Sequence, residues 1–302
     1  MKRVFLLVAG TLSGLLWSPS TAQVSDSLAI HGTGFEVDVY GSLFVVDSES
    51  NLLAVYSPGK QVSLRQVGGQ GWGNDQFDRP LGLWARNGID VFVADYGNHR
   101  IQRFDRNLNF VSSFFTRDDE DPGKRFGYPA DIALSRLGDL FICDTENSRI
   151  LKVNGLNKVE RAFGGFDAGN GRLYSPKQVE VGGWDNVFVL DRARILVFDV
   201  FGNFLYTLGE QLFESPSVLF ADQDGVMVLD GNLLYSFDEN GRSGRMSDIL
   251  ELVNRRFHGE DVRAMTYAKG VLYFLTEKGI TVLNDPGVRG KEKAVDKEKK
   301  SR

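Results

Sequence analysis

This 302-residue sequence contains a single cysteine, Cys143. One cysteine cannot form a disulfide within the chain, so we expect no covalent cross-link in the fold. A chain of this length is large enough to be held together by its hydrophobic core alone. Cys143 lies inside a hydrophobic run, and we expect it to be a small buried apolar side chain and not a reactive thiol.

Hydrophobic runs long enough to span a membrane are also missing. At the N-terminus, two basic residues precede the apolar stretch 4–17, and small residues stand at Ser20 and Ala22, where a signal peptidase inspects the chain. This stretch is shorter than the roughly 20 apolar residues of a membrane-spanning helix. We therefore predict that residues 1–22 are a cleaved signal peptide and that the mature protein is periplasmic or secreted and not an integral membrane protein. An uncleaved membrane anchor is the alternative.

Positive charge is scarce outside the last residues of the chain. The sequence has 35 Lys and Arg against 40 Asp and Glu, a net charge of −5. Between the signal sequence and the tail that starts at Gly287 there are 26 basic and 37 acidic residues, a net charge of −11. A nucleic-acid-binding protein normally has the opposite sign, so nucleic acid is not an expected partner. The tail, 287–302, has almost no apolar side chains, and we expect it to be disordered.

Motifs of metal, haem, phosphate and nucleophile chemistry are absent too. The sequence has no HExxH, CxxC, CxxCH or GxSxG pattern and no phosphate-binding glycine loop with a lysine. The glycine-rich segment 68–74, GGQGWGN, precedes a strand pattern and therefore lacks the helix N-terminus that would attract phosphate. We assign no catalytic residue from the sequence.

The sequence does contain a repeated pattern: a hydrophobic run, an Asp, a short polar turn and a second hydrophobic run. Clear copies start at Leu43, Val91, Leu140 and Val187, and weaker copies start at Val226 and Val271. The residues that end the first run, which we call the marker residues, are Asp47, Asp95, Asp144, Asp191, Asp230 and Thr276. Their spacing of 39 to 49 residues matches four strands with turns, which is one blade of a β-propeller. The six copies predict an all-β, six-bladed propeller of four-stranded antiparallel blades over residues 23–286.

The last repeat has only three strand-like segments before the charged tail. The segment 24–31, VSDSLAIH, places Val24, Leu28 and Ile30 on one face of an extended chain. It can therefore supply the missing fourth strand. We predict that this N-terminal strand closes the ring and so removes an exposed sheet edge.

The recurrence of the marker Asp favours a structural role over a catalytic one, because a single site needs only one or two copies. An Asp that opens a turn can accept hydrogen bonds from backbone N–H groups two or three residues on. It can also pair with an arginine just beyond the turn, at Arg100, Arg149 or Arg194. We expect the marker residues to stabilise the blades.

Two segments, YGNHRIQRF from Tyr96 and TENSRILKV from Thr145, resemble the core of the NHL repeat. GGQGWGNDQFDRPLGL from Gly68 and FGGFDAGNGRLYSPKQV from Phe163 resemble the segment that links one blade to the next in that family. The resemblance is strongest over residues 65–210 and implies the family's β-propeller, in a secreted bacterial-type protein. It implies no particular activity, because the family includes protein-binding, RNA-binding and enzymatic members.

The sequence has three histidines, His31, His99 and His258. A zinc enzyme of this fold, similar to the peptidyl-amidoglycolate lyases, would need several histidines near the propeller axis. In the repeat pattern His99 lies in an outer turn and the other two lie in links between blades. Three zinc ligands from one ring are therefore not available.

Residues near the start of each innermost strand line the mouth of a propeller's central channel. Polar side chains stand at these positions at Glu36, Asp131, Gln178, Glu180 and Arg263. Glu36 and Glu180 come from opposite blades of the ring, and so do Asp131 and Arg263. Because an ionised group in a tight strand needs water or a partner, two interpretations are open. The channel holds either a polar plug with internal salt bridges or a cation such as calcium on these oxygens.

The links that enter the innermost strands carry aromatic and basic side chains, which is the usual composition of an interaction hot spot. The candidate binding residues in the links are Trp72, Arg79, Tyr128 and Tyr174. We expect Phe77, Phe126 and Leu173 to fill the gaps between blades instead. The sequence therefore predicts a monomeric, non-enzymatic propeller that recognises a protein or peptide through one face. A metal-dependent hydrolase or lyase that uses the channel carboxylates is the alternative.

Overall fold

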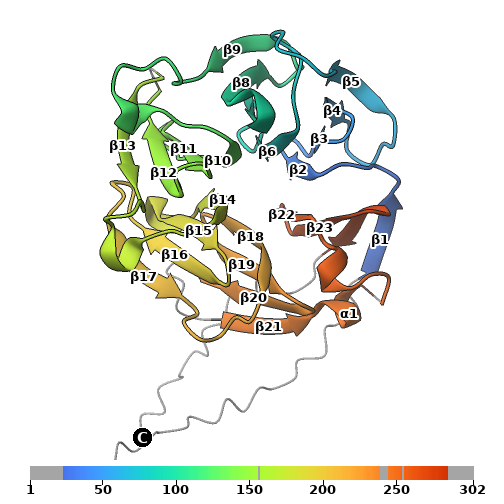
Figure 1. Ribbon diagram of the computed structural model, residues 1–302. Helices are drawn as coiled ribbons and strands as arrows, with labels where there is room; N and C mark the ends of the chain where they lie inside the picture. Colours follow the sequence, from blue (N-terminus) through green and yellow to red (C-terminus); the bar gives the residue numbers. More distant parts are fainter. Residues whose placement is uncertain (1–22, 156, 239–243, 254, 285–302) are drawn as a thin grey trace, which may run out of the picture.

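The computed structural model describes residues 23–155, 157–238, 244–253 and 255–284. These residues form six four-stranded antiparallel sheets arranged as a ring (Figure 1). The first strands of neighbouring sheets contact each other, which places them around the central axis. The prediction of a six-bladed propeller is confirmed.

The first three blades follow one another along the chain. Blade one contains β2 (Gly34–Val37), β3 (Leu43–Asp47), β4 (Leu52–Tyr56) and β5 (Ser63–Gly68). Blade two contains β6 (Pro80–Trp84), β7 (Asp90–Asp95), β8 (Arg100–Asp105) and β9 (Phe110–Phe114). Blade three contains β10 (Pro129–Leu134), β11 (Leu140–Asp144), β12 (Arg149–Val153) and β13 (Val159–Phe163).

The second half of the ring has the same plan. Blade four contains β14 (Pro176–Val181), β15 (Val187–Asp191), β16 (Arg194–Phe198) and β17 (Phe204–Leu208). Blade five contains β18 (Pro216–Asp222), β19 (Gly225–Asp230), β20 (Leu233–Phe237) and β21 (Gly244–Asp248). Blade six contains β22 (Ala264–Ala268), β23 (Val271–Thr276), β24 (Gly279–Asn284) and the N-terminal strand β1 (Gln23–Leu28).

Strand β1 closes the ring, as the sequence predicts. It pairs antiparallel with β24, with Val24 opposite Leu283 and Leu28 opposite Ile280. The side chains of Leu28 and Ile30 are buried in one hydrophobic cluster with Ile280. In Figure 1 the blue strand β1 lies at the outer edge beside the red strands of blade six. The first and last described strands therefore complete a single sheet.

The predicted signal peptide, residues 1–22, and the predicted tail, residues 287–302, both lie outside the described residues. None of the helices in the described ranges has the length and apolar character that crossing a bilayer requires.

Hydrophobic side chains fill the space between neighbouring blades, because each sheet is covered on both faces. Every residue of β15 is buried, for example, and Cys143 is fully buried in a cluster shared by blades three and four. Phe77, Phe126 and Leu173 are buried in these inter-blade clusters, as expected.

Short helices occur in the links and turns. The 3-10 helices are η1 (Tyr96–Asn98), η2 (Pro122–Lys124), η3 (Gly169–Gly171), η4 (Gly183–Asp185) and η5 (Gly259–Asp261). The sequence pattern did not indicate the one-turn helix α1 (Ile249–Leu252) between blades five and six. Ile249 and Leu252 of this helix are buried, so it fills the inter-blade gap that Phe77, Phe126 and Leu173 fill in earlier links.

The marker aspartates hold each link against the blade that the link enters. In blades two to five they accept hydrogen bonds from link N–H groups that lie 15 to 17 residues earlier in the chain. The donors are Asp78 for Asp95, Gly127 for Asp144, Tyr174 and Ser175 for Asp191, and Glu214 and Ser215 for Asp230. For these blades the prediction of donors two or three residues on is wrong, because the link passes directly beside the turn. It holds for Asp47, which accepts from the N–H of Glu49.

The expected arginine pairs do form. The Asp–Arg distances are 2.8 Å for Asp95 and Arg100, 2.9 Å for Asp144 and Arg149, and 2.8 Å for Asp191 and Arg194. All three carboxylates are fully buried. Each pair therefore joins the second and third strands of its blade to the preceding link through one buried charge.

We expect Asp144→Ala to lower the free energy of unfolding by about 1 to 3 kcal/mol, because it leaves buried donors without an acceptor. The matched control is Asp47→Ala, which removes the marker carboxylate of blade one, where the partners belong to its own turn. This control should cost less than about 1 kcal/mol. Urea denaturation measures both values. Equal losses for the two variants would contradict the tie between link and blade.

Candidate functional site

The two faces of the ring carry different loops. One face, which we call the link face, holds the links into the innermost strands and the turns between the second and third strands. The opposite face holds the loops that leave the innermost strands. The innermost strands β6, β10, β14 and β18 start at the link face, and the first residue of each is a proline.

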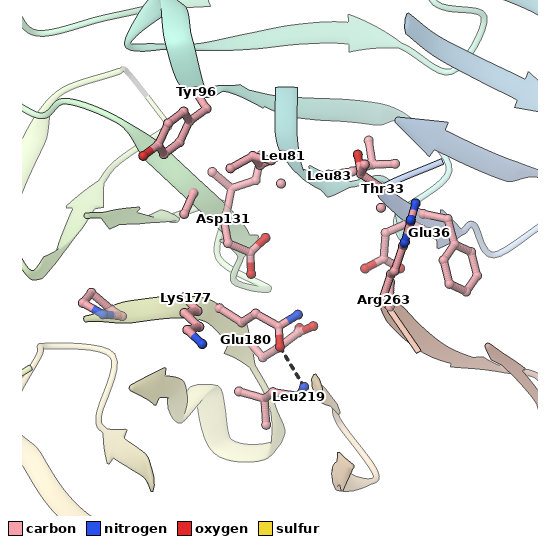
Figure 2. A pocket seen from close by; sticks show the side chains of 18 of the residues that line it. Thr33, Glu36, Leu81, Leu83, Tyr96, Asp131, Lys177, Glu180, Leu219 and Arg263 are labelled. Carbon is pink, nitrogen blue, oxygen red and sulfur yellow. Dashed lines mark hydrogen bonds between the residues drawn. The ribbon is translucent and has the colours of Figure 1, made fainter. Parts of the chain in front are cut away.

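A cavity of about 480 Å³ lies on the axis and is lined by residues of all six blades. The lining comes mainly from the first half of each innermost strand, with Tyr96 and Thr145 from two link-face turns. Figure 2 shows the side chains of Glu36, Asp131, Lys177, Glu180 and Arg263 around this space. The sequence-predicted channel residues are therefore brought together in one place.

Arg86 bridges two residues that line the cavity, Glu36 and Glu180. It follows β6 and reaches the two carboxylates that stand opposite each other in the ring, at 2.6 Å from Glu36 and 2.8 Å from Glu180. Its Nη1 also donates to the carbonyl oxygen of Ala221 at 2.7 Å. The guanidinium lies 4.6 Å from the ring centre of Phe220. One side chain thus joins blades one, two, four and five across the axis.

The charges of this triad depend on one another. Burial alone would lower the pKa of Arg86, but Glu180 and Glu36 raise it well above its ordinary value. Burial raises the pKa of Glu180, and the guanidinium of Arg86 opposes that rise. Two charge-assisted hydrogen bonds from Arg86 to Glu180 favour the ionised form of this carboxylate. Of the two interpretations of the channel, the polar plug with internal salt bridges describes this triad.

The sequence analysis missed Arg86. At the aligned position two residues after Glu36, Trp84 and their equivalents, the other blades have Asp38, Ser135, Gly182, Asp222 and Tyr267. Arg86 is the only basic residue at this position in the six repeats, and this difference was the sign of its role that the sequence offered. It stands on the opposite face, and its long side chain reaches back into the channel.

Asp131, Gln178 and Arg263 line the cavity above the triad. Asp131 accepts a hydrogen bond from the N–H of Val179 at 2.9 Å, and Gln178 accepts one from the N–H of Leu219 at 2.9 Å. Burial raises the pKa of Asp131 to about 7, in spite of the Val179 bond. Arg263 does not pair with Asp131, although the two come from opposite blades. It bonds to Glu277 at 2.8 Å instead, because that carboxylate belongs to its own blade.

These residues do not present a ready cation site. The carboxylate oxygens of Glu36 and Glu180 accept from Arg86, and oxygens of Asp131 and Gln178 accept from backbone N–H groups. Nowhere in the described ranges do three or more His, Cys, Asp or Glu side chains group so as to hold a metal ion. A calcium ion in the channel stays a prediction, and it would have to compete with the Arg86 guanidinium.

The candidate binding residues of the links are exposed on the link face. Trp72 is 62% exposed, Tyr174 is 44% exposed, and the side chain of Arg79 is 60% exposed. Tyr128 is 36% exposed. These four residues come from the links into blades two, three and four, so they lie along one side of the cavity mouth.

Each aromatic ring of this set has a cationic or aromatic neighbour. Arg100 stands 5.4 Å from the ring of Trp72, and Arg79 stands 5.4 Å from the ring of Tyr96. The ring of Tyr128 meets His99 at 4.3 Å and Tyr96 at 5.1 Å. His99 therefore lies on the link face among aromatic side chains, outside the cavity.

Comparison with known sequences identifies the repeat. The NHL repeat family matches residues 126–153, which run from the link before blade three to the end of β12. The chain therefore carries an NHL repeat in blade three of a six-bladed propeller. It is 28% identical over 180 residues to the protein brain tumor of Drosophila melanogaster. That match covers 55% of this chain and 16% of the longer protein.

Solved structures share the fold at low sequence identity. Virginiamycin B lyase from Staphylococcus aureus has a TM-score of 0.58 and 12% identity, and the match covers 82% of this chain and 78% of the lyase. The extracellular domain of a hybrid two-component system from B. thetaiotaomicron has a TM-score of 0.57 and 9% identity, with 83% of this chain and 33% of that chain covered. At these identities the comparisons show the propeller fold alone.

We expect Arg86→Met to lower the free energy of unfolding by about 3 to 5 kcal/mol, because it leaves two buried carboxylates without a cation. Urea denaturation near neutral pH measures the loss. In the control, Glu36→Gln and Glu180→Gln are combined with Arg86→Met. This triple variant should recover most of the stability, since no unpaired charge remains. A loss below about 1 kcal/mol for Arg86→Met alone would show that the triad does not hold the axis.

The raised pKa of Asp131 predicts a pH-dependent stability. The folded value of about 7 lies above the unfolded value of about 3.9, so the folded state binds the proton more tightly. The stabilising contribution is complete below the unfolded pKa and is lost as the pH rises through about 7. Between about pH 5 and pH 8, wild type should therefore lose stability relative to Asp131→Asn, by at most about 1.4 kcal/mol per pH unit. Urea titrations of both proteins measure this difference, and a constant difference would mean that Asp131 stays ionised throughout.

Proposed function

We propose that this protein is a secreted or periplasmic, non-enzymatic propeller that recognises a protein or peptide partner through its link face. One observation carries the proposal: exposed aromatic rings paired with arginines cluster on this face, beside the axial cavity. Large aromatic and arginine side chains contribute most of the binding free energy at protein interfaces. The leader-like residues 1–22 support the proposed location.

Trp72 is the strongest single candidate on this surface. Its backbone carbonyl accepts a hydrogen bond from Arg100 at 3.0 Å, so the loop is held in place while the indole points into solvent. The buried Phe77 of the same link already fills the gap between blades one and two. The indole is therefore free to contact a partner without a loss of packing.

The alternative, a metal-dependent hydrolase or lyase, would use the channel carboxylates. Two of these carboxylates are paired with Arg86, whereas Asp131, which also lines the cavity, accepts a hydrogen bond from a backbone N–H. One relative in the fold comparison is a catalytically inactive histidine-to-alanine variant of virginiamycin B lyase. The cavity described here is lined without a histidine. The arrangement of the described residues therefore favours binding over catalysis.

The double substitution Trp72→Ala with Arg79→Ala tests the proposal. Proteins from an envelope extract are captured on immobilised wild type, the retained partner is purified, and its dissociation constant is measured by titration. We expect the double variant to bind at least about tenfold more weakly, about 1.4 kcal/mol, at unchanged melting temperature.

The matched control is Trp184→Ala with Arg136→Ala, which removes an exposed Trp and an exposed Arg from loops on the opposite face. This control should bind the partner like wild type. A weaker affinity in the control alone would place the function on the opposite face. If binding survives the first double variant but is lost in Glu36→Gln with Glu180→Gln, a channel site replaces the proposed surface.

A further inference from the structure

The link face of blade four carries a concentration of arginines around one exposed tyrosine. The ring centre of Tyr174 lies 4.9 Å from the guanidinium of Arg172, 4.8 Å from that of Arg192 and 5.0 Å from that of Arg194. Arg172 also lies 4.2 Å from the ring centre of Phe166, which is 76% exposed. We call these five residues the blade-four arginine cluster.

Two of the three arginines pair with no carboxylate among the described residues. Arg194 is paired with the buried marker Asp191 at 2.8 Å. Within the described residues, no ion pair joins Arg172 or Arg192 to an acidic side chain. Lys177, which is exposed and lines the cavity mouth three residues after Tyr174, likewise has no acidic partner there. The cluster therefore presents uncompensated positive charge on a protein whose net charge is −5.

The local fold keeps these arginines close together. In blades two and three, four residues separate the marker Asp from the next arginine, whereas in blade four only Arg192 and Ala193 separate Asp191 from Arg194. Arg192 has a left-handed backbone with φ 57°, as the tight turn requires. The turn of blade four is two residues shorter than those of blades two and three, which contain His99 and Glu146 respectively. The turn of blade four therefore contains Arg192 and no acid, whereas the turn of blade three contains Glu146.

The positions of the guanidinium groups over an aromatic ring favour carboxylate ligands. A guanidinium stacked on an aromatic ring keeps the N–H groups at its edge available for two parallel hydrogen bonds to a carboxylate. Since Arg172 and Arg192 both lie within 5 Å of one ring centre, alternate side chains of an extended segment, about 7 Å apart, can reach both.

We propose that the blade-four arginine cluster binds an acidic, Asp- or Glu-rich extended segment of the protein partner. This inference rests on the proposed function and adds the chemistry of the partner to it. The negative charge on the rest of the propeller repels such a segment elsewhere, so the cluster also fixes where the segment docks.

Fluorescence anisotropy with a labelled oligoglutamate peptide tests the inference, with an oligoglutamine peptide of equal length as the reference. We expect wild type to bind the glutamate peptide and not the glutamine peptide, with an affinity that falls as salt is added. The double variant Arg172→Gln with Arg192→Gln should bind the glutamate peptide at least about tenfold more weakly. The control Arg136→Gln with Arg161→Gln removes two exposed arginines outside the cluster and should stay within about twofold of wild type.

The inference would be overturned by equal binding of the two peptides, by unchanged binding in the Arg172 and Arg192 double variant, or by tighter binding of a short single-stranded oligonucleotide through the same two arginines. Free glutamate as a competitor distinguishes a site for an extended segment from a site for a single carboxylate, and full competition at low concentration would also overturn it. The Trp72→Ala with Arg79→Ala variant should keep its affinity for the glutamate peptide. A partner that still needs Trp72 and Arg79 while the glutamate peptide fails to bind would refute the acidic segment and leave the proposed function standing.

Discussion

The buried marker carboxylate is the constraint on which the link face depends. In blades two to five it holds the incoming link by one or two N–H groups, and in blades two to four it also holds an arginine of the third strand. Arg100 and Arg194 use the rest of their guanidinium groups on link carbonyls and on exposed rings. The arginines that contact these exposed aromatic side chains are therefore themselves held by buried carboxylates. A surface built in this way is rigid before a partner arrives, which lowers the entropic cost of binding.

The axis is organised by a second buried charge. Arg86 pairs with two carboxylates that face each other across the ring and joins four blades near the opposite face. Asp131 and Gln178 lie above this triad, toward the link face. The proposed binding surface lies on that same face of the ring. A partner docked on the link face would also control access to the cavity.

The fold could be predicted from the sequence more fully than the site. The spacing of the marker residues gives the number of blades, and the missing fourth strand of the last repeat indicates closure by residues near Leu28. These features are local or periodic. The role of Arg86 could not be predicted because its partners Glu36 and Glu180 are 50 and 94 residues away in the sequence. Its long side chain also reaches residues that occupy a different position in the alignment of the strands. The contacts of Arg172 and Arg192 with Tyr174 escaped for a similar reason, since the two arginines come from a link and a turn that only the fold brings together.

The pairing of β1 with β24 has a consequence for how the chain acquires its structure. The last sheet joins residues from the two ends of the described chain, so its formation closes a loop that contains nearly the whole propeller. The entropy of closing a loop this long is paid in a single step, and contacts of such large sequence separation slow folding. Until that step, β24 has an unpaired edge of the right register for β1. A second molecule that is still open offers the same strand, so exchange of β1 between two chains is the misassembly to which this ring is most exposed at high concentration.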